Sequence, residues 1–418
     1  MPDDLSRTPP APAWAERYAD RAARMQASEI RELLKLLDQP DIISFAGGIP
    51  DPALFPLVAI RAAYDAILGD PATVAQALQY SVSEGYRPLR EWITRHMAGL
   101  GVPCGIDNVV ITCGSQQGLD FLGKLFLSAG DTALVTAPTY LGALQAFNPY
   151  QPRYDRLSLE GNQTPGLLRQ SAEQAGSRVR LAYIVPDFAN PSGETLSRAQ
   201  RERLLDCAAE LDIPLIEDAA YRVLRYEGEA ETALLALEVA RVGSIERART
   251  LYCGTFSKII APALRVGWVC GAAEVVQKLV LVKQAADLHS ATINQMVMHR
   301  VAEAVFERQV ARIRVSYRER RDAMLAALAR HMPPGVQWTH PQGGMFVWVT
   351  LPEGMDAAVL LAEAVRDARV AFVPGQAFFA DGSGANTLRM NFSLPTPAQI
   401  EAGVARLGRL IAQRRPGG

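Results

Sequence analysis

Between residues 105 and 270, short apolar runs alternate with longer segments of helical periodicity. The runs lie at 109–112, 133–135, 181–185, 214–216, 251–253 and 266–269. Segments such as 196–211 lie between them and carry apolar residues at helical spacing. Strands that are apolar on both faces suit a sheet buried between two helical layers. The pattern therefore predicts a three-layer α/β/α domain around a mostly parallel sheet, with ligands at the carboxyl ends of its strands.

The pattern changes near residue 300, where we predict a domain boundary. A helical stretch covers 301–331 and is rich in arginine on its polar side. Short strands at 345–351, 370–373 and 388–393 then mix with helices, which is typical of a smaller α+β unit. The predicted division is an N-terminal arm with a helix (1–45), a large domain (46–300) and a small C-terminal domain (301–418).

Composition argues against several classes of protein. The 43 basic and 44 acidic side chains give a net charge of −1, which disfavours binding to nucleic acid or to an anionic membrane. The five cysteines include no CxxC pair, so we expect neither a disulfide framework nor a structural zinc site. The chain shows no secretory signal and no apolar run of the ~18 residues that a membrane span needs. We therefore expect a cytoplasmic protein.

One segment looks like a nucleotide-binding loop but lacks a residue that such a loop needs. Residues 118–124 match GxxxxGK, yet Leu125 stands where a Ser or Thr must bind magnesium. Leu119, Leu122 and Phe126 share one helical face, so we interpret the segment as a helix. The five histidines show no HExxH spacing, and Gly-x-Ser-x-Gly does not occur, so a metal or serine hydrolase has no support.

Polar residues gather instead at the ends of the predicted strands. They are Gly114–Ser115–Gln116, Asn190 to Gly193, Asp218, Tyr221, Ser257–Lys258 and Arg265. Taken singly, each could be a turn, a helix cap or a solvated side chain. Their position at strand ends, where α/β sheets bind ligands, makes the set a candidate site.

In this order the motifs resemble the fold-type-I enzymes that depend on pyridoxal 5′-phosphate, specifically the class I and II aminotransferases. The resemblance extends from about Ile42 to the C-terminus. Its strongest elements are NPSG at 190–193, DAAY at 218–221, Ser257–Lys258 with RVGW at 265–268, and Arg389. It implies the fold-type-I architecture, pyridoxal phosphate as cofactor and aminotransferase activity.

The resemblance assigns four residues to the reactive part of the cofactor. The amine of Lys258 would form a covalent Schiff base with the aldehyde, and later carry a proton as general base and acid. Partial burial helps, because desolvation disfavours the ammonium form. Asp218 would hold the proton on the pyridine nitrogen, while Asn190 and Tyr221 would donate to the phenolate oxygen.

The resemblance also places the cofactor phosphate and the ring face. The helix start at Ser115 and Gln116 would bind the phosphate, because free N–H groups and the helix dipole attract anions there. Ser257 and the guanidinium of Arg265 would complete this cup. Tyr140 matches the position that stacks on the cofactor ring.

Arg389 is the candidate for the α-carboxylate of the substrate. Alternation in residues 388–393 puts Leu388, Met390 and Phe392 on one face of a strand and Arg389 on the other. An arginine in such a strand is costly unless paired, and a carboxylate is a matching bidentate partner. A structural salt bridge is the alternative.

Two further segments are similar to the α-aminoadipate and kynurenine aminotransferases. One is SEIRELLKL at 28–36, followed by a glycine pair that ends at Gly48. In that subgroup the helix covers the site, Arg31 would meet a distal carboxylate, and Gly48 would let the backbone approach the substrate. Arg31 has no acidic residue three or four positions away, so it is available to a ligand or simply solvated.

The other segment is QYSVSEGY at 79–86. The resemblance implies that Tyr80 reaches the phosphate of the neighbouring subunit and borders the substrate, as Asn190 does. It thereby implies a homodimer with shared active sites.

We expect an aminotransferase that exchanges an amino group between an L-amino acid and 2-oxoglutarate by a ping-pong mechanism. The donor would be 2-aminoadipate-like and acidic, aromatic or branched. A different reaction on the same cofactor, such as a C–S or β-lyase, decarboxylase or racemase reaction, would share Lys258, Asp218 and Arg389 and stays open.

A transcriptional regulator with an aminotransferase-like module is the third interpretation. It would need a DNA-binding domain larger than the segment before Ile42, and the balanced charge disfavours it.

Overall fold

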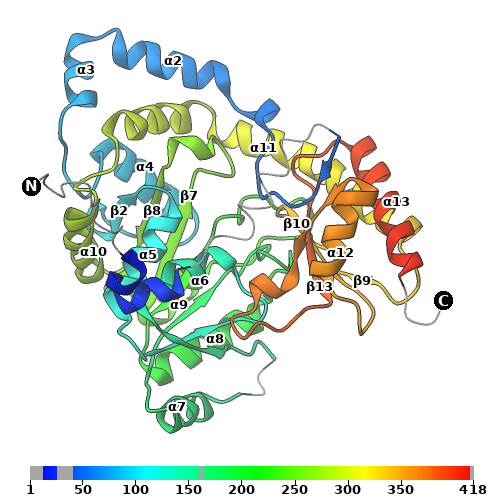
Figure 1. Ribbon diagram of the computed structural model, residues 1–418. Coiled ribbons are helices and arrows are strands. Elements are labelled where there is room, and N and C mark those ends of the chain that lie inside the picture. Colours follow the sequence, from blue (N-terminus) through cyan, green and yellow to red (C-terminus); the bar gives the residue numbers. More distant parts are fainter. Residues whose placement is uncertain (1–12, 26–40, 161–162, 415–418) are drawn as a thin grey trace, which may run out of the picture.

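A seven-stranded sheet forms the centre of the large body of the molecule (Figure 1). The computed structural model describes residues 13–25, 41–160 and 163–414. The strand order is β2-β8-β7-β6-β5-β3-β4. The strands are β2 (Val109–Thr112), β3 (Thr132–Val135), β4 (Arg153–Arg156), β5 (Val179–Ile184), β6 (Leu215–Asp218), β7 (Thr250–Thr255) and β8 (Gly267–Cys270). β8 runs antiparallel to both its neighbours and the other pairs are parallel, which confirms the mostly parallel sheet.

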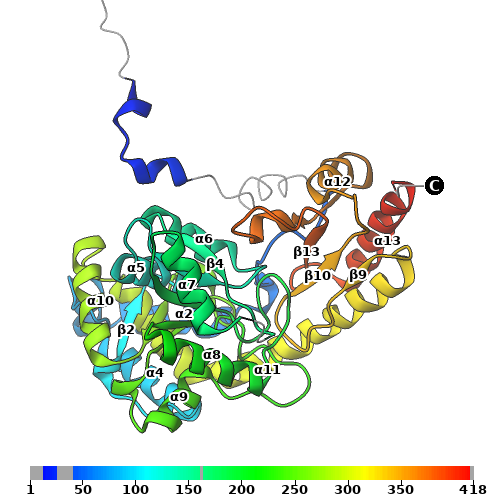
Figure 2. The same ribbon diagram turned by 90° about the horizontal axis from the view of Figure 1, so that it is seen from below.

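Helices lie on both sides of this sheet and complete three layers (Figures 1 and 2). They are α4 (Arg87–Gly99), α5 (Ser115–Phe126), α6 (Leu141–Phe147), α7 (Pro165–Gln174), α8 (Arg198–Leu211), α9 (Leu234–Val242) and α10 (Ala273–Ala286). The sheet strands between these layers are buried along their length, except β4 and the start of β5. Residues 118–124 lie inside α5, so the interpretation of this segment as a helix is confirmed.

A four-stranded antiparallel sheet forms the core of a smaller unit near the C-terminus, in the order β12-β13-β10-β9. Its strands are β9 (Gln337–Trp338), β10 (Phe346–Thr350), β12 (Val373–Pro374) and β13 (Thr387–Asn391). The helices α12 (Ala357–Glu363) and α13 (Pro397–Gln413) and a π-helical turn (Ala364–Ala368) accompany it. The orange and red colours of Figure 1 mark this unit.

Two elements connect the large and small units. The 40-residue helix α11 (Thr292–His331) packs against α13 at one end and against α2 (Leu57–Leu68), α3 (Pro71–Leu78) and α4 elsewhere. Strand β1 (Ile43–Ser44) pairs in parallel with β11 (Val370–Ala371), so a segment from early in the chain joins the C-terminal unit. Residue 300 lies within α11. The division at 45 and 300 stays a prediction.

The N-terminal arm is described only in part. Two short 3-10 helices, η1 (Trp14–Arg17) and η2 (Asp20–Arg24), precede the gap at 26–40. The predicted helix at 28–36, with Arg31, therefore lies outside the described residues. Within the described part of the chain, no helix combines the length and apolar character that a membrane crossing requires.

Candidate active site

A cavity of about 130 Å³ opens beyond the carboxyl ends of β6 and β7, and most of the predicted site residues line it. Those at its wall are Ser115, Gln116, Tyr140, Asp218, Tyr221, Ser257, Lys258 and Arg265. They come from the start of α5, the loop before α6, the end of β6 and the loop after β7. The parallel strands end on one edge of the sheet, which brings together residues that lie up to 150 positions apart in the sequence.

Asp218 ends β6 at the floor of this cavity and is buried. Its Oδ2 accepts a hydrogen bond of 2.8 Å from the hydroxyl of Tyr183 on β5. Its Oδ1 is buried without a hydrogen-bond partner among the described residues. Burial raises the pKa of Asp218 to about 6, against the lowering effect of Tyr183. The carboxylate is thus placed to accept a hydrogen bond from one further donor.

Lys258 also lines the cavity, and its amine is partly buried. It donates a hydrogen bond of 2.9 Å to the backbone oxygen of Gly48. Burial, helped by the positive charges of Arg389 and Arg265, lowers the pKa of Lys258 to about 8, while Asp218 opposes this shift. The neutral fraction of this amine near physiological pH is therefore a minority but far larger than for an ordinary lysine, and the neutral form is the one that acts as nucleophile or base.

The turn between β2 and α5 supplies helix-start amides to the cavity. Gly114 adopts φ +75°, and a side chain there would collide with the guanidinium of Arg265. Nη2 of Arg265 donates to the backbone oxygen of Cys113 at 3.2 Å. Ser257 is buried beside this turn, and Thr255 donates to its hydroxyl at 3.0 Å. Free amides, a hydroxyl and a guanidinium at a helix start form a binding site suited to an anion.

Arg389 on β13 lies on the side of the cavity that faces the small unit, and only 1% of it is exposed. Its Nη1 donates to Oδ1 of Asn190 and its Nη2 to the backbone oxygen of Ala46, both at 2.8 Å. Its Nε has no partner, and among the described residues no carboxylate pairs with it. Burial lowers the pKa of Arg389 to about 10. The structural salt bridge considered from the sequence is therefore not found in the described part of the chain.

Aromatic rings and an amide fix the geometry around Arg389. Its guanidinium lies over the ring of Phe346 at 4.3 Å and near that of Phe378 at 5.1 Å. Nδ2 of Asn190 donates to the hydroxyl of Tyr221 at 3.5 Å. Asn190 therefore connects Arg389 to the wall of the cavity, although neither Asn190 nor Arg389 lines the cavity itself.

Both faces of β13 are buried. Leu388 and Met390 pack into the hydrophobic core, as alternation predicts, and Arg389 and Asn391 are buried on the opposite face. The polar face of β13 is buried because it packs against the site, where Asn190 and the backbone of Ala46 contact it.

Comparisons with known proteins agree with this geometry. A family model described as aminotransferase class I and II matches residues 42–407. The chain belongs to the class I and II aminotransferases. It is 40% identical to an aromatic-amino-acid aminotransferase of Thermococcus litoralis, over 96% of this chain and 95% of the relative. This aminotransferase therefore belongs to a family of enzymes that depend on pyridoxal phosphate, and it falls in the aminoadipate and kynurenine subgroup.

Solved structures support the same assignment. An α-aminoadipate aminotransferase from Thermus thermophilus, complexed with N-(5′-phosphopyridoxyl)-L-leucine, is 40% identical with a TM-score of 0.85. The match covers 96% of this chain and 98% of that one. A kynurenine aminotransferase from Pyrococcus horikoshii is 42% identical with a TM-score of 0.88, over 96% and 99% of the two chains. The fold-type-I architecture predicted from the sequence is confirmed.

The residues of this aminotransferase fit the cofactor of its family. The unpartnered Oδ1 of Asp218 is a buried acceptor of the kind that a protonated pyridine nitrogen requires. The cavity wall also offers one amine at Lys258 and the anion-binding start of α5. Each chemical feature of pyridoxal phosphate thus has a matching group in the cavity.

Besides Asn190 and Arg389, two predicted residues within the described ranges do not line the cavity, Tyr80 and Gly48. Tyr80 is 79% exposed and its ring contacts that of His289, with 5.9 Å between the ring centroids. Gly48 reaches the site only through its backbone oxygen, and a side chain there would approach the ring of Phe346 to 3.2 Å. Arg31 lies outside the described residues.

Tyr183 is a site residue that the sequence patterns did not predict. It lies within an apolar run that predicts a buried strand, and only its hydroxyl signals a polar role. Tyr183 and Asp218 lie on adjacent strands, β5 and β6, so sheet pairing rather than sequence proximity makes the contact. The aromatic pair Phe346 and Phe378 beside Arg389 was also not predicted, because the three residues come from separate elements that only the folded chain brings together.

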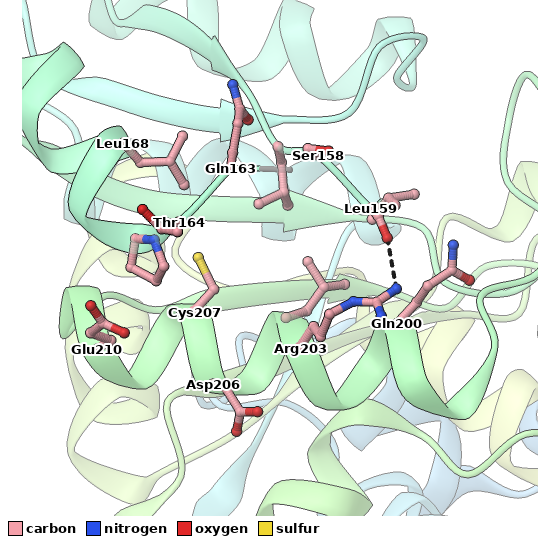
Figure 3. A pocket seen from close by; sticks show the side chains of 13 residues that line it. Ser158, Leu159, Gln163, Thr164, Leu168, Gln200, Arg203, Asp206, Cys207 and Glu210 are labelled. Carbon is pink, nitrogen blue, oxygen red and sulfur yellow. Dashed lines mark hydrogen bonds between the residues drawn. The ribbon is translucent and has the colours of Figure 1, made fainter. Parts of the chain in front are cut away.

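A second cavity, of about 240 Å³, lies between α7 and α8 and contains none of the predicted site residues (Figure 3). Leu168, Leu204 and Cys207 line it together with the charged side chains of Arg203 and Glu210. Arg203 donates a hydrogen bond to the backbone oxygen of Leu159 at 3.0 Å, so its guanidinium already has a partner within the protein. This cavity offers no set of converging groups comparable to that around Lys258.

Proposed function

We propose that this aminotransferase transfers an amino group from an L-amino acid to 2-oxoglutarate by a ping-pong mechanism, with pyridoxal phosphate attached covalently to Lys258. The observation that carries the proposal is that one cavity is lined both by the amine of Lys258, whose pKa is lowered, and by the buried carboxylate of Asp218, whose Oδ1 has no partner among the described residues. An amine nucleophile and a buried anion are what the aldehyde and the pyridine ring require.

When bound, pyridoxal phosphate supplies an aldehyde for the amino group and a ring that accepts the electrons of the α-carbon bond that breaks. Lys258 would take the proton from the α-carbon of the substrate and pass it to the former aldehyde carbon of the cofactor, which a pKa of about 8 allows near neutral pH. Asp218 keeps the ring nitrogen protonated. Asn190 and Tyr221 would hold the phenolate oxygen, and Tyr140 would contact the ring.

Substrate binding centres on Arg389 in this proposal. Its guanidinium is buried, lacks an acidic partner among the described residues and has an unused Nε. A carboxylate that enters beside it gains charge-assisted hydrogen bonds without the cost of breaking an existing ion pair. Asn190 and Gly48 border the same position. We assign the α-carboxylate of both the donor and 2-oxoglutarate to this place.

The preferred donor is a 2-aminoadipate-like acidic, an aromatic or a branched amino acid. The relatives are named for aminoadipate, aromatic amino acids and kynurenine, and these names support the range. We assign the second carboxylate of acidic substrates to Arg31. Replacing Arg31 with Ala should then raise KM for dicarboxylates much more than for monocarboxylates, and equal losses would remove this role.

We also propose a homodimer with shared active sites. Tyr80 and its neighbours Leu78 and Val82 are exposed, as are Leu57 and Val58 on α2. Such an apolar surface is typical of one that a partner subunit covers. Tyr80 of one subunit would donate to the phosphate bound by the other. Light scattering of the holoenzyme should give twice the mass of one chain, and a monomeric mass would remove the proposal.

Borohydride reduction and a half-reaction screen test the central proposal. Reduction followed by peptide mapping should find the cofactor covalently attached to Lys258. After the same reduction, a Lys258→Ala protein should carry no covalently attached cofactor. Amino acids from the three donor classes should each convert the bound cofactor to its pyridoxamine form, and 2-oxoglutarate should reverse the change. Ammonia and a 2-oxo acid released without an acceptor would indicate a lyase instead.

A further inference from the structure

A buried lysine lies behind the turn that is predicted to hold the cofactor phosphate. Lys283 on α10 has no exposed side-chain surface. Its ammonium donates to both oxygens of Asp287, each at 2.9 Å, and to the hydroxyl of Ser290 at 2.9 Å. It also donates to Oε1 of Gln117 at 3.2 Å. A buried ammonium is stable only when its donors are used in this way.

Gln117 connects this ion pair to the turn. Its Oε1 accepts a hydrogen bond of 2.8 Å from the backbone N–H of Cys113, in addition to the one from Lys283. Its Nε2 donates to Oδ2 of Asp287 at 2.8 Å. The cation contacts the amide oxygen and the anion contacts the amide nitrogen, so the pair fixes which way the amide points. A reversed amide would present a donor to the N–H of Cys113 and lose that bond.

The peptide groups of the turn are held on both sides. The N–H of Cys113 is held by Gln117, and its carbonyl oxygen accepts from Arg265. Gly114 follows with φ +75°, and Ser115 then begins α5. A side chain at Gly267 would meet the backbone nitrogen of Ser115 at 2.6 Å, so β8 packs directly against the turn. Gln117 thus holds the peptide group before Cys113 and Arg265 the one after it, so a change in the backbone angles of Cys113 would disturb the Arg265 contact and the start of α5 together.

We propose that Lys283 and Asp287 are positioning residues that act through Gln117 to fix the turn at 113–115 for the cofactor phosphate. None of the three lines the cavity, so none is a catalytic residue. The inference rests on the proposed function, because it takes the start of α5 as the phosphate site. The proposal predicts that only the binding of the phosphate group becomes weaker, because the ring and the aldehyde would contact other residues.

Two variants separate this role from general stability. Gln117→Leu removes the link and leaves the ion pair in place. The double variant Lys283→Met with Asp287→Asn removes the pair without leaving a buried charge alone. Lys278→Met is the matched control, because Lys278 is an exposed lysine on the same helix. The measurement is the dissociation constant of the cofactor-free protein for pyridoxal phosphate and for pyridoxal, which lacks the phosphate, with near-ultraviolet circular dichroism as the check on folding.

Both variants should bind pyridoxal phosphate about tenfold more weakly, the loss expected when one hydrogen bond to a charged group is misdirected. Their affinity for pyridoxal should match that of the unaltered protein, and Lys278→Met should change neither. Unchanged affinity for pyridoxal phosphate, or equal losses for both ligands, would overturn the inference. If the double variant does not fold, Gln117→Leu decides the question. Failure of the unaltered protein to bind pyridoxal phosphate would instead overturn the proposed function.

Discussion

The hydroxyl of Tyr183 donates a 2.8 Å hydrogen bond to Oδ2 of Asp218 on the adjacent strand. This bond occupies one oxygen of a buried carboxylate and leaves Oδ1 without a partner among the described residues. Burial nevertheless dominates and raises the pKa of Asp218 to about 6. The cofactor-free protein therefore carries an anion that is incompletely stabilised at neutral pH, and a cationic ligand would relieve this cost.

We predict that Asp218→Asn stabilises the cofactor-free protein at neutral pH. A carboxyl group with a pKa raised from 3.8 to about 6 binds more protons when folded, so its contribution to stability falls as the pH rises through this interval. At pH 7 the cost is about 3 kcal/mol, from about 1.4 kcal/mol per pKa unit. Urea unfolding should show a gain of up to this size at about pH 7 and little gain at about pH 4. A gain of the same size at both pH values would show that the charge is not its cause.

We predict that the attachment of pyridoxal phosphate to Lys258 becomes faster as the pH rises through about 8. Burial, with Arg389 and Arg265 nearby, lowers the pKa of this amine to about 8, and only the neutral amine attacks an aldehyde. Stopped-flow absorbance of the cofactor-free protein measures the rate at each pH. Arg389→Met removes one neighbouring cation, so the midpoint should move to higher pH. A midpoint that stays in place or falls would contradict the electrostatic cause.

We predict that Arg389→Lys lowers kcat/KM for amino acids and 2-oxo acids by about 100-fold, equivalent to about 2.7 kcal/mol. A lysine keeps the charge but loses the planar fork, the contact with Phe346 and the hydrogen bond to Asn190. Steady-state kinetics with both substrates provide the measurement, and the absorbance of the bound cofactor should stay unchanged. Arg318→Lys at an exposed position on α11 is the control and should leave the kinetics unaltered.

Hydrophobic patterning predicted the main features of the fold. All six apolar runs between 105 and 270 are strands of the central sheet, because strands buried on both faces must be apolar. β4 was missed, since Arg153–Arg156 is a polar edge strand that carries no such pattern. The antiparallel direction of β8 could not be predicted either, because apolar runs carry no information about strand direction.

Motifs predicted the cavity wall, but contacts between distant elements had to come from the structure. Lys258 and Asp218 lie where the strand ends place them. The Tyr183 contact depends on the register of two strands, and the Lys283 network depends on how α10 packs against α5. The role of Tyr80 stays a prediction, since it involves a second subunit.

A buried anion next to the site supports the last prediction. Asp187 accepts from Arg201 at 2.7 Å and Arg222 at 2.9 Å, with Arg225 at 4.0 Å. Asp187→Ala would leave the fully buried Arg201 with backbone carbonyls as its remaining partners. The loss of a buried counter-ion should lower the free energy of unfolding by about 3–5 kcal/mol.

Urea unfolding of the cofactor-free protein measures this loss, with Asp206→Ala as the matched control. The ion pair of Asp206 with Arg241 is solvent-exposed, with 71% and 37% of the two side chains accessible. Its removal should cost less than about 1 kcal/mol, because water and salt screen exposed pairs. Similar losses in the two variants would mean that burial does not set the strength of the Asp187 cluster, and that Arg201 is stabilised mainly by its backbone carbonyls.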